Sequence, residues 1–270
     1  MHWRVSDLHN GQRGSMDINW IGIQTLYKRE TWRFLKVWNQ TLVAPMITTL
    51  IFLAILTLAM GGNARMVHGM PFTEFVAPGL IMMAMVQNAF ANTSSSFMIA
   101  KLQGVIIDWL LPPFSAGELV VGMALGGVTR GLMVGCTVAL AMSFFAPLGV
   151  HSLPALLYVS VAATLMMALL GILTGIIANT PDQAATITNF VVTPLSFLSG
   201  TFYSIHDLPP IWQQISHFNP FFYMIDGFRF AITGYSDANP AVGAVVLGIT
   251  ILVLGTIAQV MFARGWRLKS

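Results

Sequence analysis

The sequence predicts an all-α integral membrane protein, and three observations lead to that class. Hydrophobic residues make up 56% of the 270 residues and charged residues only 9%, against roughly 25% charged residues in ordinary soluble domains. Mean hydropathy over the chain is +0.73. A helix needs about 20 apolar residues to cross the hydrocarbon core of a bilayer. Six stretches meet that length, at about 42–62, 74–98, 118–146, 153–178, 184–203 and 241–262.

Residues 17–38, before the first span, have the pattern of an amphipathic helix. One face repeats at steps of three and four and consists of Trp20, Ile23, Tyr27, Thr31, Phe34 and Trp38. Another face carries the basic residues Lys28, Arg29, Arg33 and Lys36. This pattern is typical of a helix in the membrane interface, with tryptophan anchors and cations toward anionic headgroups. A soluble helix packed on another protein is the alternative.

The distribution of basic residues predicts the orientation of the spans. Ten of the 13 Lys and Arg residues lie before the first span, in the loop after the second, or after the sixth. Only Arg65 and Arg229 lie in the opposite loops. Because cytoplasmic loops carry the excess of Lys and Arg, both termini are expected in the cytosol, as an even number of spans requires.

Residues 204–234, between the fifth and sixth spans, are not a typical polar loop. Their aromatic residues suit the membrane interface, and the pair Pro209 and Pro210 interrupts any continuous helix. We expect external re-entrant helices, short enough to dip into the outer leaflet. Backbone at that depth must be covered by protein or line a water-filled cavity.

Polar side chains within the second and fifth spans form a candidate substrate path. They recur at near-helical spacing, and in lipid such faces turn inward. They can line a polar route or form hydrogen bonds between helices, and the sequence favours neither interpretation. The candidates are Gln87, Asn88, Asn92, Ser95, Ser96, Thr186, Asn189 and Thr193.

One charge falls near the middle of a span. Arg130 lies in the third span, and an arginine at that depth costs about 2.5–3.5 kcal/mol, so it should face protein or water. It could contact an anionic group of a substrate, but a carboxylate or carbonyl partner on another helix is the favoured interpretation. Gly127, Gly131 and Gly135 recur every four residues around it, which predicts close helix packing.

The motifs of enzymes and nucleotide-binding proteins do not occur in the sequence. It has no Gly-Lys-Ser/Thr loop, no His-Glu-x-x-His and no Cys-x-x-Cys, so neither catalytic residues nor a metal site is expected. The 13 Lys and Arg residues are too few and too dispersed for a nucleic-acid partner. Two kinds of function remain open at this point. One is a secondary transporter or channel, and the other is a lipid-modifying enzyme that uses His206, Asp207 and His217.

Two stretches resemble the ABC-2 type permeases. Residues 101–113, which run from Lys101 to two consecutive prolines and are followed by Gly122 and Arg130, look like the family's first cytosolic loop. The second stretch is similar to the family's passage from span five through its external re-entrant helices. Its matching residues are Gly200, Phe202, Pro209, Trp212, Asn219, Pro220, Tyr223 and Arg229.

The resemblance implies that residues 1–270 form a single ABC-2 transmembrane domain. It implies a homodimer in the bacterial cytoplasmic (inner) membrane, surrounded by membrane lipids and working with a dimer of separate ABC ATPase subunits. ATP and Mg would be bound by that partner ATPase, and this chain would hold no cofactor. The family branch exports nodulation factors, polysaccharides and drugs, so an amphiphilic, lipid-linked, polysaccharide or drug-like substrate is expected.

The resemblance also assigns a coupling role to residues 101–113, with residues 17–38 as the connecting helix beside them. The coupling helix would dock in the ATPase, and Pro112 and Pro113 would end it because proline lacks the backbone N–H. The family often has Thr and Glu where this chain has Val105 and Ile107. The expected ATPase contacts are Gly104, Val105, Ile106, Asp108, Trp109, Leu110, Leu111 and Pro113.

Overall fold

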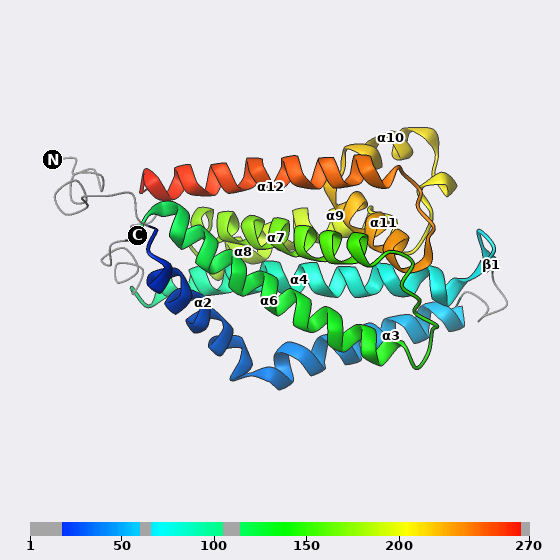
Figure 1. The fold of residues 1–270 in the computed structure, drawn as a ribbon, viewed down its shortest axis with the longest axis horizontal. Helices are drawn as coiled ribbons and strands as arrows, with labels where there is room; N and C mark the ends of the chain where they lie inside the picture. The colour runs from blue at the N-terminus through cyan, green and yellow to red at the C-terminus, as the bar shows by residue number, and fades with distance from the viewer. Residues whose placement is uncertain (1–17, 60–65, 105–113, 266–270) are drawn as a thin grey trace.

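The computed structural model describes residues 18–59, 66–104 and 114–265. These residues are mostly helical, and the longer helices run along the long axis of the molecule (Figure 1). In chain order the helices are α2 (Trp20–Leu35), the π-helix η1 (Asn39–Val43), α3 (Ala44–Ala59), α4 (Phe72–Leu102), α6 (Ala116–Met142), α7 (Leu153–Ile177), α8 (Pro181–Ile187), the π-helix η3 (Thr188–Val192), α9 (Thr193–Phe197), the 3-10 helix η4 (Ile205–Asp207), α10 (Pro210–Phe218), α11 (Pro220–Thr233) and α12 (Pro240–Ala263).

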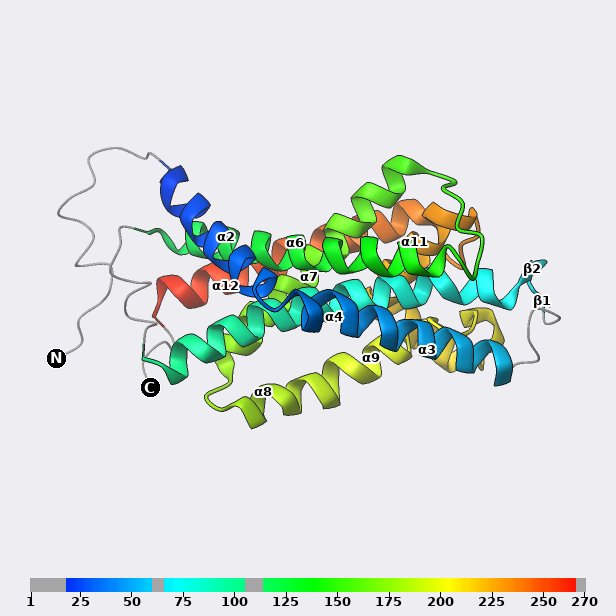
Figure 2. The same ribbon diagram turned by 90° about the horizontal axis from the view of Figure 1, so that it is seen from below.

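The two ends of this helical bundle carry different elements. α2 begins at one end, where α4 and α12 finish, and we name it the α2 end (Figure 1). The opposite end, which we name the α10 end, holds α10, α11 and a short hairpin (Figures 1 and 2). That hairpin pairs β1 (Met66–Val67) with β2 (Met70–Pro71). It departs from the all-α prediction because His68 and Gly69, at φ 49° and 82°, form the two-residue left-handed turn that joins antiparallel strands.

Five helical runs in the described part of the chain are long and apolar enough to cross a membrane: Asn39–Ala59, α4, α6, α7 and α12. They match expected spans one, two, three, four and six to within a few residues. The expected fifth span, 184–203, falls on α8, η3 and α9, which have 7, 5 and 5 residues. These segments end at Phe197, before the predicted boundary.

The π-helical turn η3 has a local cause in the sequence. Proline lacks a backbone N–H, so Pro194 cannot donate the bond that an α-helix would direct to Phe190. Thr193 instead donates its backbone N–H to the carbonyl of Thr188, five residues earlier. Such a wide turn shifts the faces of the helix by one residue.

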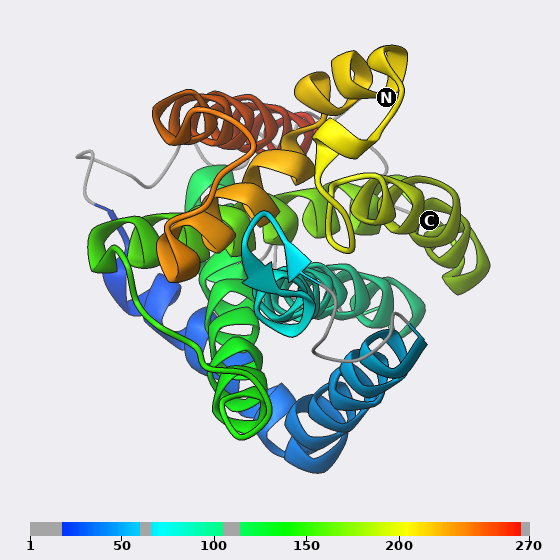
Figure 3. The same ribbon diagram turned by 90° about the vertical axis from the view of Figure 1, so that its right-hand side faces the viewer.

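α4 is the central helix, and α6 and α7 pack on it along much of its length (Figure 3). Glycines make this close approach possible. A Cβ added to Gly131 of α6 would come within 2.9 Å of the carbonyl oxygen of Met85, and one added to Gly171 of α7 within 2.5 Å of that of Phe90. The glycine repeat of the third span therefore packs against helices, as the sequence predicts.

α2 lies across α6, and the residues of its predicted tryptophan face fall on both its buried and its exposed sides. Asn19 caps its first turn by accepting the Gly22 N–H at 2.8 Å. Ile23 and Phe34 of the predicted face are buried, but Trp20 and Trp38 are 69% and 55% exposed. The residues of the predicted face are therefore divided between buried and exposed positions, because α2 turns the side that carries the buried Glu30 toward the bundle.

Candidate functional site

Two adjoining cavities open along one face of α4, and together we name them the trough. The first, of about 550 Å³, lies between α4 and the α8–η3–α9 segment. The second, of about 330 Å³, lies between α4 and the η1–α3 run, and Gln87 lines both. Seen along the bundle, α3 and α8 stand at the two edges of this face of α4 (Figure 3). Volumes of this size suit small-molecule ligands.

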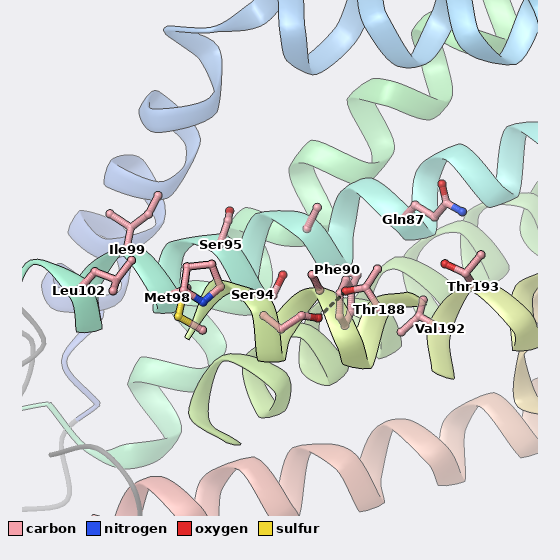
Figure 4. Close-up of a pocket in the computed structure, with 14 residues that line it drawn as sticks. Gln87, Phe90, Ser94, Ser95, Met98, Ile99, Leu102, Thr188, Val192 and Thr193 are labelled. Carbon is pink, nitrogen blue, oxygen red and sulfur yellow. Dashed lines mark hydrogen bonds between the residues drawn. The ribbon is translucent and has the colours of Figure 1, made fainter. Parts of the chain in front are cut away.

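Part of the predicted polar path lines the trough. Gln87, Ser95 and Thr193 line the first cavity, and Asn88 joins Gln87 in the second. Figure 4 shows the labelled side chains of the first cavity coming from two facing segments, α4 and the η3–α9 region. The sequence analysis missed Ser94 and Thr188, which also line this cavity.

Thr186 and Asn189 do not line either cavity, and their place on a substrate path stays a prediction. Both are exposed, and Thr186 donates its hydroxyl to the carbonyl of Asp182 at 2.8 Å. The prediction counted helical steps back from Thr193 and reached Asn189. Because η3 is a π-helical turn, Thr188 lies one turn from Thr193 instead, and it faces the cavity with Thr193.

Asn88 and Asn92 mainly join helices. Arg130 of α6 donates to the amide oxygen of Asn88 at 3.1 Å, and Asn88 donates to the carbonyl of Ala84 at 3.0 Å. Arg130 thus has an interhelical partner, but an amide rather than the carboxylate or carbonyl that the sequence analysis expected. Its buried Nε has no partner among the described residues. Asn92 is fully buried and lines neither cavity.

Beside the trough, a charged cluster joins α2 to α4, and we name it the α2–α4 cluster. Its centre is Glu30, a fully buried carboxylate that accepts from Arg29 at 2.9 Å, Arg33 at 3.1 Å and Ser96 at 2.8 Å. Arg33 also donates to the carbonyl and amide oxygens of Asn92, at 2.8 and 3.0 Å. Arg33 therefore contacts α4, although the predicted basic face would direct this cation toward lipid headgroups.

Glu30 was not among the predicted site residues, although the sequence carries a signal for it. It is the only acidic residue of α2, with arginines at the preceding position and three positions later. Residues three apart on a helix are neighbours on its surface. A lone carboxylate placed between two cations is the pattern of an ion pair that a helix carries into a bundle.

At the α10 end, Arg229 is fully buried in α11, whereas the sequence predicts a cation in an external loop. It donates to the carbonyls of Gly200 at 2.6 Å and Phe75 at 3.2 Å. Its guanidinium lies 4.0 Å from the centre of the Phe75 ring. A third nitrogen lies 3.9 Å from a carboxylate oxygen of Asp237. Arg229 therefore joins three segments that are distant in sequence.

Two carboxylates missed in the sequence analysis complete this second cluster, which we name the Arg229 cluster. Asp237 accepts from the hydroxyls of Ser204 at 2.6 Å and Tyr235 at 2.7 Å. Asp226 accepts from Ser236 at 2.6 Å and from the Asp237 N–H at 2.7 Å. Burial raises the pKa of Asp226, although these hydrogen bonds favour its charged form. Burial and the bond to Asp237 raise the pKa of Tyr235 to about 12.

Asn219 and Tyr223 of the external motif fix α11 in place. Asn219 accepts the Phe221 N–H at 3.0 Å and so caps α11. Its amide nitrogen donates to the Leu195 carbonyl at 3.1 Å and the Ser199 hydroxyl at 3.2 Å, near the end of α9. Tyr223 donates to a backbone carbonyl of α10 at 3.0 Å. In the described structure these residues act as connections between helices.

The remaining residues of the external motif mark turns and the edge of the trough. Phe202 stacks on Phe197 with ring centres 5.7 Å apart, and both line the second cavity. Pro209 and Pro220 stand at the starts of α10 and α11, where the missing N–H is not needed. Trp212 is partly exposed on α10. The short helices of region 204–234 are thus present, while their depth in a membrane stays a prediction.

The two histidines of the alternative enzyme hypothesis make contacts with different residues. His206 lies 4.0 Å from a carboxylate oxygen of Asp237. His217 instead packs edge to face on Phe222. Within the described residues, no group of three or more His, Cys, Asp or Glu side chains could hold a metal ion.

Most of the expected coupling helix lies outside the described residues. Val105, Ile106, Asp108, Trp109, Leu110, Leu111 and Pro113 belong to that part of the chain. Gly104, just before it, has φ +71°, a left-handed conformation that ends α4 readily because glycine lacks a Cβ. Lys101 fixes the end of α4 by donating to the carbonyls of Ile176 at 2.6 Å and Ala178 at 2.9 Å.

Comparison with known proteins identifies the family. The family described as ABC-2 type transporter matches residues 22–233. The inner membrane transport permease YadH of Escherichia coli K12 is 38% identical over 255 residues, which cover 94% of this chain and 100% of that protein. Nodulation protein J of Rhizobium leguminosarum bv. viciae is 27% identical over 92% of this chain and 95% of its own. That of Neorhizobium galegae is 23% identical over 89% and 92%.

These matches extend over nearly all the described helices, so they concern the same bundle that contains the trough. The Escherichia coli relative is named an inner membrane transport permease, and the five long apolar helices fit a chain that crosses the membrane several times. This chain therefore belongs to the ABC-2 type transporter family and is a multi-pass transport permease of the cytoplasmic membrane, not an enzyme.

Proposed function

We propose that this chain is the permease subunit of an ATP-driven exporter, and that its substrate is an amphiphile that moves along the trough. The observation that carries the proposal is the composition of the trough. Gln87, Ser94 and Thr188 provide polar groups, while Phe90 and Met98 provide apolar surface. An amphiphile has both kinds of surface and needs both kinds of contact.

The energy for transport comes, in this proposal, from a separate ABC ATPase dimer that binds ATP and Mg. The sequence has no Gly-Lys-Ser/Thr loop of its own, and ABC-2 family membership implies such a partner. Residues 101–113 would form the coupling helix that docks in the ATPase. This assignment requires both chain termini and the α2 end to face the cytosol.

The proposal includes six spans and a homodimer. The α8–η3–α9 segment would cross the membrane as the fifth span, although it is shorter than the five long runs. It contacts the rest of the bundle little, and Phe190 on it is 79% exposed. The trough is open on the side between this segment and α3. A second copy placed there would close the trough and bury these apolar side chains.

Transport into inside-out membrane vesicles tests the proposal. Cells that express the chain with its ATPase supply the vesicles, and the probe is a fluorescent amphiphilic dye. ATP should drive uptake, and Ala91→Trp should reduce the rate at least tenfold because the indole would fill the first cavity. Leu140→Trp is the matched control, since Leu140 is an exposed residue of α6 and outside the trough. Uptake driven by a proton gradient without ATP would support a secondary transporter instead.

The coupling role needs its own experiment. Leu110→Asp places a charge in the expected apolar contact with the ATPase, and loss of a packed interface anchor typically costs about 2 kcal/mol or more. The variant should insert normally but lose co-purification with the ATPase and substrate-stimulated hydrolysis. Wild-type values for both would show that residues 101–113 are only a surface loop.

A further inference from the structure

A separate cavity of about 420 Å³ lies between α2 and the last turns of α4. It is distinct from the trough, and we name it the basic cavity. Its lining comes from two helices only. The residues are Arg29, Glu30, Trp32, Arg33 and Lys36 from α2 and the residue that follows it, and Ser96, Ile99, Ala100 and Gln103 from α4 and its end.

The basic cavity contains N–H donors that have no partner among the described residues. Arg29, Arg33 and Lys36 face one carboxylate, Glu30, which already accepts from both arginines and from Ser96. The ammonium of Lys36 has no hydrogen-bond or ion-pair partner among the described residues. The Nε of Arg33 is buried and equally without a partner there. The cavity thus has unused N–H donors on two cationic side chains, Lys36 and Arg33, which favour an anion with several acceptor oxygens.

The position of the basic cavity points to an anion that belongs to a lipid. α4 has 31 residues, about ten more than a bilayer core requires, so its last turns extend to the level of the headgroups. Trp32 is 65% exposed beside the cavity, as interfacial tryptophans are. Ile99 is 43% exposed and lines both the basic cavity and the first cavity of the trough. Apolar surface therefore continues directly from the charged lining.

We propose that the basic cavity binds the phosphate ester of an anionic amphiphile, with the phosphate against Lys36 and the hydrocarbon chain over Ile99. Gln103 can donate a further hydrogen bond from the end of α4. Arg33 holds the floor of the site in place through its bonds to Glu30 and Asn92. This site does not depend on the direction of transport or on the ATPase.

Lipid binding by the purified full-length chain in detergent provides the test. We expect phosphatidylglycerol, which carries one phosphate diester and a net negative charge, to bind more tightly than zwitterionic phosphatidylcholine, as measured by native mass spectrometry. Lys36→Gln should weaken phosphatidylglycerol binding about fivefold, the effect of one cation near a phosphate. The substitution removes no described contact, so the melting temperature without lipid should not change. Lys36→Arg should retain binding.

Lys28→Gln is the matched control because Lys28 is an exposed residue of α2 that does not line the cavity. Equal weakening by Lys28→Gln and Lys36→Gln would mean that only general surface charge attracts the lipid, and would overturn the proposal. Equal binding of the two lipids would overturn it as well.

The source of the phosphate is separated by competition. Displacement of phosphatidylglycerol by millimolar inorganic phosphate would mean that the phosphate alone occupies the site. Lipid binding that persists in its presence would mean that the hydrocarbon chain is also recognised. If Lys36→Gln leaves lipid binding unchanged but weakens co-purification with the ATPase, the cavity is a protein contact and the lipid site is wrong.

Discussion

Each end of the bundle has a polar cluster that contains an arginine, but only one of the two arginines is fully shielded from solvent. Arg229 at the α10 end is fully buried and donates to backbone carbonyls of two other segments. Arg33 in the α2–α4 cluster is 30% exposed in its side chain and lines the basic cavity. Arg33 also has a backbone partner, the carbonyl of Asn92, so the two arginines differ mainly in how much solvent reaches them. The comparison suggests a rigid α10 end and an α2 end that can rearrange during transport.

The largest effect is expected from Arg229→Met. Methionine approximates the length of the side chain but removes the hydrogen bonds to the Gly200 and Phe75 carbonyls and leaves Asp237 without its nearest cation. Removing one partner from a buried charge cluster typically costs about 3–5 kcal/mol. We expect a strongly lowered melting temperature or loss of folded protein, measured by fluorescence-detected size exclusion during heating. A stable variant would show that the α10 end is not held by this residue.

A smaller loss is expected from Glu30→Gln at the α2 end. Arg33 and Ser96 donate to different oxygens of Glu30, so the amide keeps an acceptor for only one of them and removes the charge. An unsatisfied buried polar group costs about 1–3 kcal/mol. Ser96→Ala, alone and combined with Glu30→Gln, completes a double-mutant cycle that isolates the 2.8 Å contact. A loss as large as that of Arg229→Met would contradict the contrast between the two ends. Altered transport with little change in melting temperature would support a rearranging α2 end.

Asn219→Ala should have an intermediate to small effect on the α10 end. It removes the cap of α11 and the two bonds to the end of α9, and loss of such a cap costs about 0.5–2 kcal/mol. Asn219→Asp is the control because it retains the capping acceptor but not the amide donor. If the aspartate variant is as stable as the wild type, capping alone explains the role of Asn219.

The contrast between the two ends also shows what the sequence could predict. Long apolar runs predicted five spans closely because hydrophobic length and helix boundaries are local properties. Of the polar residues at which η3 and α9 face the trough, Thr193 was predicted but Thr188 was not, because Pro194 changes the register by a π-helical turn. The burial of Arg229 could not be predicted either, because its partners Gly200 and Phe75 are distant in sequence and no neighbouring residue indicates them. Contacts between distant segments decide which charges are buried.

The smallest expected effect is a loss of stability at alkaline pH, which originates at Tyr235 of the α10 end. Tyr235 donates to Asp237 at 2.7 Å, and its pKa is raised to about 12, first by burial and then by this bond. In the unfolded chain a tyrosine loses its proton near pH 10. Between these values the folded state binds more protons, so the contribution of Tyr235 to stability is complete below about pH 10 and is lost as the pH rises toward 12.

Tyr235→Phe removes this titration and the hydrogen bond together. The variant should be less stable than the wild type at pH 8, by about 1 kcal/mol for one hydrogen bond to a charged or neutral group. The difference should shrink as the pH rises from 10 to 12, because only the wild type then loses the contribution of Tyr235. Comparing melting temperatures of the two proteins cancels the titration of every other group. A difference that stays constant over this range would mean that Asp237 does not depend on the Tyr235 proton, and that Ser204 and Arg229 suffice to hold it.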